Sequence, residues 1–408
     1  MRDLQKGRKN EQQSLTFTAA DGIKTGISIM VFSISSKELC EVLVNISRVV
    51  NSKNVLPILD NIVFSVNKDV LTLKASDGEN TLTADITLPK AAEEEGTFSV
   101  NAKNITEAIK NLPDTPLEFS TDKAKMAVKV DYFTGKFSLP ITDGSEFPIM
   151  RDMNENDTKT FTIPEGLLQE NIARSIFATA NEELRPVMNG IYFDFKTENL
   201  TVVACDGHLL VRNIIHTIKA ADDESAGGFI LPKKPSQILK TILRRTSEDN
   251  VTVSFDGSQA IIKAETYTMQ CKLIEGRYPN YNSVIPQNNS MIVIANRASL
   301  IAVLKRVSLF SNENSQLVCV HVEPGKMQLS TEDYDFSMKA SEDLTCNYDG
   351  DTMDIGLKGP KVLEILNNIN SEEVEIQMAD PARPVLILPV EQPDDMDVLM
   401  LQMPMLIA

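Results

Sequence analysis

The chain has 408 residues, enough for two or three domains that each bury an apolar core of their own. Hydrophobic residues make up 42% and charged residues 24%, as in ordinary globular proteins, and no apolar stretch approaches the roughly twenty residues of a membrane-spanning helix. The net charge of −17 by itself argues against a nucleic-acid partner, because phosphate binding relies on Lys and Arg. That argument depends on where the charges lie.

Residues 1–29 precede the first strongly patterned segment, which starts at Met30. They combine a charged, polar lead with a short apolar stretch and lack the small-residue cleavage site of a secretory signal. We expect an N-terminal extension that is disordered or reflects an upstream start choice, and we exclude it from the fold.

From Met30 onward, one pattern occurs three times along the chain. A short alternating run followed by a helical apolar pattern begins at Phe32, at Phe161 and at Ile292, with offsets of 129 and 131 residues. A strand follows in each unit, and then a second strand and helix, which begin at Phe98, Phe229 and Ile355. We therefore predict three copies of one α+β domain, each with two helices among antiparallel strands, over residues 30–157, 158–286 and 287–408.

Positive charge is concentrated in the six predicted helices, which span residues 35–49, 102–111, 165–179, 233–245, 297–309 and 358–369. They contain 15 basic and 6 acidic residues, hence a charge of +9, and the rest of the chain carries −26. Lys and Arg also suit solvated helix faces, but Glu would serve equally well there, and the fourth and fifth helices contain none. The segregation favours a basic helical surface that faces phosphates without reading bases.

The five cysteines are widely spaced, with no C-x-x-C pair and only three histidines to complete a metal site. We interpret them as small apolar side chains in a reducing cytoplasm, and we expect neither a metal nor another cofactor.

Five motifs appear in order along the chain: "VLPILDNI", "RPVMNGIYF", "LTVVACDGHLL", "GRYPNYNSVIP" and the terminal "MPM". Together with the triple repeat, they resemble the sliding clamps of bacteria, the beta subunits of DNA polymerase III, from Met30 to the C-terminus. The resemblance implies a DNA clamp fold in which two chains join head to tail as a homodimer. The six-domain ring would have helices lining the hole and sheets forming the rim, and it would act as a processivity factor without enzymatic activity.

The resemblance also implies the partners: double-stranded DNA bound without sequence preference, the replicative DNA polymerase, the clamp loader and other clamp-binding proteins. It implies a groove that receives a short apolar peptide from these proteins. Its residues would be Met188, Cys205, Gly207, His208, Leu209, Leu210, Pro279, Val284, Leu401, Met403, Pro404 and Met405. Methionine-rich pockets repack around different anchors, which suits many clients, although each Met taken singly also suits ordinary core packing.

Candidate DNA-binding residues follow from the basic helices and from one loop that matches a DNA-facing loop of the family. They are Lys53, Lys233, Lys234, Lys240, Arg244, Arg245, Arg297, Lys305 and Arg306, whereas Arg185 suits a structural role. The resemblance places Phe137 at one side of the ring closure and Leu309 with Phe310 at the other, and all three also suit an internal core.

The chain departs from the commoner family pattern at Cys205, where Thr is frequent, and at Leu209, where a basic residue is frequent. It also runs one residue further than usual after "MPM". Partner preference at the groove rim is the property that these departures affect.

The neighbouring Cys205, Asp206 and His208 are the residue types of a nucleophilic site, so a hydrolase is the rival interpretation. The corresponding turn of the first repeat keeps Asp77 and Gly78 but has no histidine, which indicates turn chemistry common to the repeats. A repeat-built scaffold that never meets DNA is a third interpretation, which retention on circular but not linear DNA would exclude.

Overall fold

The computed structural model describes residues 30–122, 124–154 and 156–407, so the predicted N-terminal extension lies outside the described residues. Within them, the chain forms three successive repeats, each with eight strands and two α-helices. The first repeat contains β1 (Val31–Ser35), α1 (Ser36–Ile46), β2 (Asn61–Asn67), β3 (Val70–Ser76), β4 (Asn80–Thr87), β5 (Gly96–Asn101), α2 (Ala102–Lys110), β6 (Pro116–Asp122), β7 (Ala127–Tyr132) and β8 (Gly135–Asp143).

The second and third repeats follow the same order of elements. The second contains β9 (Lys159–Pro164), α3 (Glu165–Ser175), β10 (Gly190–Phe195), β11 (Leu200–Cys205), β12 (Leu209–Ile215), β13 (Gly227–Pro232), α4 (Lys233–Ile242), β14 (Asn250–Phe255), β15 (Gln259–Lys263) and β16 (Tyr267–Lys272). The third contains β17 (Met291–Asn296), α5 (Arg297–Ser308), β18 (Leu317–Glu323), β19 (Lys326–Asp333), β20 (Met338–Thr345), β21 (Met353–Lys358), α6 (Gly359–Asn367), β22 (Glu373–Met378), β23 (Val385–Pro389) and β24 (Met396–Gln402).

Short 3-10 turns join several of these elements. They are η1 (Pro57–Asp60), η2 (Gly144–Glu146), η3 (Ile176–Ala178), η4 (Pro186–Met188) and η5 (Tyr281–Val284). No helix in the described ranges exceeds the twelve residues of α5, and none combines the length and apolar character needed to cross a bilayer.

The helices form because their apolar residues recur at helical spacing, and asparagine side chains cap the first turns of α2 and α5. In α2, Ala102, Ile105 and Ile109 are buried on one face, and Asn101 accepts a hydrogen bond from the backbone amide of Asn104. Each isoleucine that is fully buried in this way stabilises the fold by about 1.5–3 kcal/mol relative to exposure. The α+β class predicted from the periodicity is confirmed.

The sheets run continuously from one repeat into the next. The twelve-stranded sheet has the order β1-β6-β7-β8-β5-β2-β3-β4-β16-β15-β14-β9, so it joins the first repeat to half of the second through β4 and β16. The eight-stranded sheet has the order β13-β10-β11-β12-β24-β23-β22-β17 and joins the second repeat to the third through β12 and β24. The four-stranded sheet, β20-β19-β18-β21, belongs to the third repeat alone and ends at β20.

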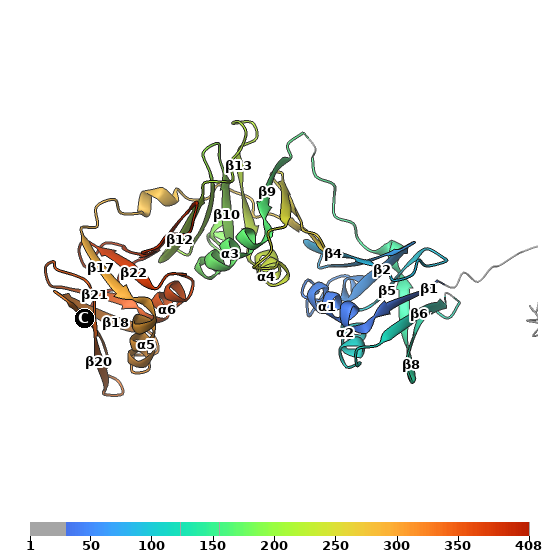
Figure 1. Ribbon diagram of the computed structural model, residues 1–408, viewed down its shortest axis with the longest axis horizontal. Helices are drawn as coiled ribbons and strands as arrows, with labels where there is room; N and C mark the ends of the chain where they lie inside the picture. The colour runs from blue at the N-terminus through green and yellow to red at the C-terminus, as the bar shows by residue number, and fades with distance from the viewer. Residues whose placement is uncertain (1–29, 123, 155, 408) are drawn as a thin grey trace, which may run out of the picture.

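The three repeats are arranged as an arc (Figure 1). The helices of all three lie on its concave side and the sheets on its outer side, with β8 near one end and β20 near the other. Helices packed against one side of each sheet therefore give the arc two chemically different faces.

Candidate nucleic-acid and partner-binding surfaces

The observed helices carry a smaller positive charge than the predicted helices. The observed helices contain 11 basic and 6 acidic residues, a charge of +5, whereas the predicted ones gave +9. The difference arises because Arg48, Arg244, Arg245 and Lys358 lie just beyond the observed helix ends; α4, for example, ends where Leu243 adopts an extended backbone. The sign of the helical charge is as predicted.

Two lysines at the start of α4 oppose the helix dipole. Lys233 and Lys234 occupy its first turn, which contains no acidic residue. The positive end of a helix dipole disfavours cations and favours anions, so these lysines do not stabilise the helix by themselves. Lys233 raises the positive potential at this helix end, where an external anion would gain most, whereas the charge of Lys234 is paired with Asp77.

Three of the predicted DNA ligands have acidic partners within the protein. Arg244 pairs with the carboxylates of Glu165, Asp249 and Glu265 at 2.9–3.0 Å. Arg306 contacts Glu342 at 2.5 Å, and Lys234 pairs with Asp77 at 2.6 Å. Exposed pairs such as those of Arg244 and Arg306 add little to stability because water screens them, but they neutralise charge that phosphates would otherwise meet.

The other six predicted DNA ligands have no carboxylate partner among the residues that the structure describes. They are Lys53, Lys233, Lys240, Arg245, Arg297 and Lys305. Lys233 donates to the neutral side-chain oxygen of Asn181 at 3.1 Å, and Arg297 donates to the carbonyls of Leu366 and Ser371 at 3.0 and 2.8 Å. No carboxylate of the described residues therefore neutralises their charges.

A hollow between the second and third repeats contains three of the predicted cations and a fourth, Arg174, that was not predicted. Arg174 lines this hollow together with Lys240, Arg245 and Arg297. Burial and the nearby Arg245 lower the pKa of Arg174, while Glu170 acts in the opposite direction. Arg174 sits on the buried side of α3, where a charge count by helix gives no signal of its position.

The predicted peptide-groove residues gather at the same junction on several elements. A buried apolar cluster, here called the junction cluster, contains Leu210 and Leu401, with Cys205 and Met403 packed at its edge. The amide of Met403 donates to the carbonyl of His208 at 2.8 Å, so the C-terminal segment runs alongside the turn after β11. The structure thus brings together residues from β11, β12 and the chain end.

The other predicted groove residues differ in where they lie. Leu209 is 1% exposed and packs in the main core, because neighbouring residues of β12 face opposite sides of the sheet. Met188 is buried in η4, whereas Pro279 and Val284 are exposed on the segment between β16 and β17. Pro404 and Met405 are half-buried, and the amide of Met405 donates to the carbonyl of Gly356 at 2.8 Å.

The turn at Asp206 has the geometry of a structural turn. Its carboxylate accepts hydrogen bonds from the amides of His208 and Leu209 at 2.9 and 2.7 Å, and Gly207 has a φ of +91°. Asp77 accepts in the same way from Glu79 and Asn80, with Gly78 at a φ of +93°, so the predicted common turn chemistry is confirmed.

The geometry at Cys205 is unsuited to nucleophilic catalysis. Burial raises the pKa of its thiol, whereas a nucleophilic cysteine needs a lowered one. Its sulfur accepts a hydrogen bond from the backbone amide of Gly207 at 3.3 Å and is not paired with the imidazole of His208 in the described structure. No group of three or more metal-ligating side chains occurs within the described ranges either.

A polar and aromatic cluster behind the junction was also missed. The Asp194 carboxylate accepts a hydrogen bond from the Tyr281 hydroxyl at 2.8 Å and pairs with Lys196 at 2.6 Å. Tyr192 stacks on Tyr278 with ring centroids 4.7 Å apart, and burial together with Asp194 raises the pKa of Tyr192 to about 12. The cluster fastens the segment that connects the second repeat to the third.

The three predicted closure residues lie near the ends of the arc. Phe137 is half-buried on β8 and lines a hollow with Lys125, Lys129 and Lys136. Leu309 and Phe310 follow α5 and are 77% and 41% exposed. These exposures fit surface positions better than the internal core that was the alternative for Leu309 and Phe310.

Comparison with known proteins gives the same family over nearly the whole described chain. Models of the N-terminal, central and C-terminal domains of the DNA polymerase III beta subunit match residues 30–151, 162–280 and 282–406. The beta sliding clamps of Caulobacter vibrioides and Haemophilus influenzae are each 27% identical, over 91% and 88% of this chain and 99% and 95% of their own lengths.

Solved structures agree with the fold. The sliding clamp of Bartonella birtlesii, solved with griselimycin bound, is 25% identical with a TM-score of 0.85, covering 93% of this chain and all of that one. The Pseudomonas aeruginosa clamp is 24% identical with a TM-score of 0.86 over the same shares. The three-repeat arc, the basic concave face and these matches together show that the chain belongs to the beta subunit family of DNA polymerase III, the bacterial sliding clamps.

Proposed function

We propose that two copies of this chain close head to tail into a ring around duplex DNA. As a member of the sliding clamp family the chain is a processivity factor that tethers the polymerase to DNA, and it is not an enzyme. The proposal concerns how the chain does this: its oligomeric state, its DNA ligands and its peptide groove. A protein that works on the bacterial chromosome is also expected in the cytoplasm.

Open strand edges at the two ends of the arc are the observation that carries the ring proposal. Within the chain, β4 pairs with β16 at the first junction and β12 pairs with β24 at the second. The strands at the corresponding positions of the remaining repeats are β20 and β8, which lie at the two ends of the arc (Figure 1). β20 is the last strand of its sheet, and in the described structure residues 135–140 of β8 pair with β7 on one side only, because β5 pairs with β8 only at residues 141–143. An exposed edge strand is a template for pairing with another chain, and β20 of one copy with β8 of the next repeats the in-chain junction.

Apolar contacts support the same closure. Leu309 and Phe310 near one end would pack near Phe137 at the other, where Lys125, Lys129 and Lys136 surround the hollow. Two such interfaces close a ring of six repeats, and we propose repeat boundaries after residues 157 and 286.

The uncompensated cations of the concave face are the proposed DNA ligands. Lys53, Lys233, Lys240, Arg245, Arg297 and Lys305 would meet phosphates without reading bases. Arg244 and Arg306 contribute less, because carboxylates already neutralise them. Topological linkage then retains the ring on DNA, so the electrostatic attraction can be weak enough for sliding.

The surface around the junction cluster is the proposed groove for partner peptides. It combines buried apolar residues with Met403, Pro404 and Met405 at the chain end and exposed positions at His208 and Val284. An apolar peptide from the polymerase, the clamp loader or another clamp-binding protein would dock there.

Retention on DNA of different topology tests the ring. Loaded onto nicked circular DNA, the protein should stay bound in high salt and be released after a restriction enzyme linearises the circle. Equal loss from circular and linear DNA would refute topological linkage. A covalently closed circle loaded in parallel controls for effects of the nick.

A further inference from the structure

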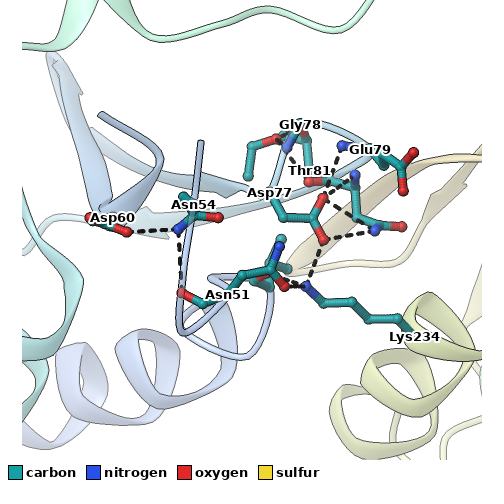
Figure 2. A network of polar contacts seen from close by, with 11 residues as sticks. Asn51, Asn54, Asp60, Asp77, Gly78, Glu79, Thr81 and Lys234 are labelled. Carbon is teal, nitrogen blue, oxygen red and sulfur yellow. Dashed lines mark hydrogen bonds and ion pairs between the residues drawn. The ribbon is translucent and has the colours of Figure 1, made fainter. Parts of the chain in front are cut away.

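Lys234 reaches across the junction between the first and second repeats (Figure 2). Its ammonium donates to the carbonyl oxygen of Val49, to Oδ1 of Asn51 and to Oδ2 of Asp77, each at 2.6 Å. An ammonium group has three donors, so these acceptors use all of them. The lysine predicted as a DNA ligand has no donor left for a phosphate in this arrangement.

The backbone of its own turn fixes the Asp77 carboxylate, independently of Lys234. Its side chain is 5% exposed, and it accepts hydrogen bonds from the amides of Glu79 and Asn80 at 2.9 and 2.7 Å. Burial by itself would raise the pKa of this carboxyl, but the hydrogen bonds from Lys234, Asn80 and the turn amides lower it below its ordinary value. A largely buried, charged carboxylate needs a cation, and Lys234 supplies it.

The same contact holds the loop that carries Lys53. Val49 and Asn51 lead into the loop 51–57, and the Asn54 side chain donates to Asp60 at 2.7 Å (Figure 2). Lys53 is exposed between these anchor points. The position of Lys53 therefore depends on Lys234, 181 residues further along the chain.

The second junction contains a looser version of this contact. Asp206 occupies the turn equivalent to that of Asp77, and its nearest ammonium, that of Lys361, lies 3.8 Å away and is closer to Glu364 at 3.1 Å. The β12–β24 pairing there extends over seven residue pairs, against five for β4–β16, and the junction cluster packs beside it. Apolar packing and a longer sheet do at the second junction what the lysine does at the first.

We propose that Lys234 is a positioning residue, whose ammonium fixes the first repeat against the second and holds loop 51–57, which carries Lys53, in place. Loss of the Lys234 charge should therefore loosen the first junction and leave the second junction unchanged. The statement about the junction stands on the contacts above, and only its consequence for DNA rests on the proposed function.

Hydrogen exchange of the full-length protein tests the junction. Lys234→Met should accelerate exchange of the hydrogen-bonded amides of residues 77–81 by about tenfold or more, the effect expected for losing hydrogen bonds to a charged donor. Asn51→Ala removes one of the three acceptors of the Lys234 ammonium and should give a smaller increase at the same residues. Lys361→Met is the matched control and should leave exchange at residues 206–210 unchanged. Unchanged exchange in Lys234→Met, or equal loosening of the second junction in Lys361→Met, overturns the proposal.

DNA binding by the same variants distinguishes a positioning role of Lys234 from a direct contact with DNA phosphate. If Lys234 contacted a phosphate directly, Lys234→Met would reduce the slope of log K against log salt by about 0.9. That reduction with unchanged exchange makes Lys234 a DNA ligand and refutes the positioning role. Faster exchange supports the positioning role whether or not the wild-type protein proves to be retained on circular DNA.

Discussion

Replacing Leu309 by aspartate should convert the proposed ring into monomers. Leu309 is 77% exposed in the single chain, so the substitution removes no core contact and the repeat should fold normally. Complete burial of a leucine is worth about 1.5–3 kcal/mol, and three quarters of that is about 1–2 kcal/mol for each interface. An unpaired carboxylate trapped in the interface adds about 3–5 kcal/mol.

The summed penalty of about 4–7 kcal/mol for each interface weakens association by about three to five powers of ten. Because the ring needs two such interfaces, the free-energy penalty for closing the ring is twice the penalty for one interface. Sedimentation velocity over a concentration series measures it, with far-UV circular dichroism to show that the variant is folded. The control is Ile149→Asp, since Ile149 is 84% exposed and lies between η2 and β9. A folded Leu309→Asp variant that dimerises like the wild type would refute this closure.

Three further predictions concern the other surfaces. Removing Lys240 and Arg245 together should lower DNA affinity and reduce the slope of log K against log salt by about 1.8, measured by fluorescence anisotropy; an unchanged slope would exclude them as phosphate ligands. His208→Ala should weaken binding of an apolar client peptide in calorimetry while retention on circular DNA persists, and loss of retention with intact peptide binding would contradict the groove assignment. Asp77→Asn should lower the free energy of unfolding by a constant amount at neutral and mildly acidic pH. Because hydrogen bonds hold the folded pKa of Asp77 below its ordinary value of 3.8, that difference should begin to shrink as pH falls below about 3.8 and be lost below the folded pKa, and a difference that vanished by pH 6 would show that Asp77 is not the titrating group.

The repeat architecture could be predicted because it depends on local patterns. Apolar spacing and the order of strands and helices recur every 126–131 residues, so the α+β repeats and the common Asp-Gly turn follow from residues near one another in sequence. The opposite facing of Leu209 and Leu210 was also predictable, since neighbouring residues of a strand alternate sides. Treating both as groove residues overlooked that rule.

The pairing of charges could not be predicted from local patterns. Arg244 meets Glu165 across 79 residues, and Lys234 meets Asp77 across 157 residues. Only the fold decides which cations are already neutralised. Helix ends had the same difficulty, because α4 ends through the backbone conformation of Leu243 and not at a Gly or Pro signal.

The sheets that pass uninterrupted through both in-chain junctions have a mechanical consequence. Force applied along the arc acts on the rows of backbone hydrogen bonds at β4–β16 and β12–β24. At both junctions the polypeptide itself also links the two repeats covalently. An interface between β20 and β8 of another copy would have the same pattern of backbone hydrogen bonds, but no covalent link would connect the two chains. A loader that opens such a ring would therefore meet the least resistance at the two interfaces between separate chains. No special sequence is needed at these interfaces for that.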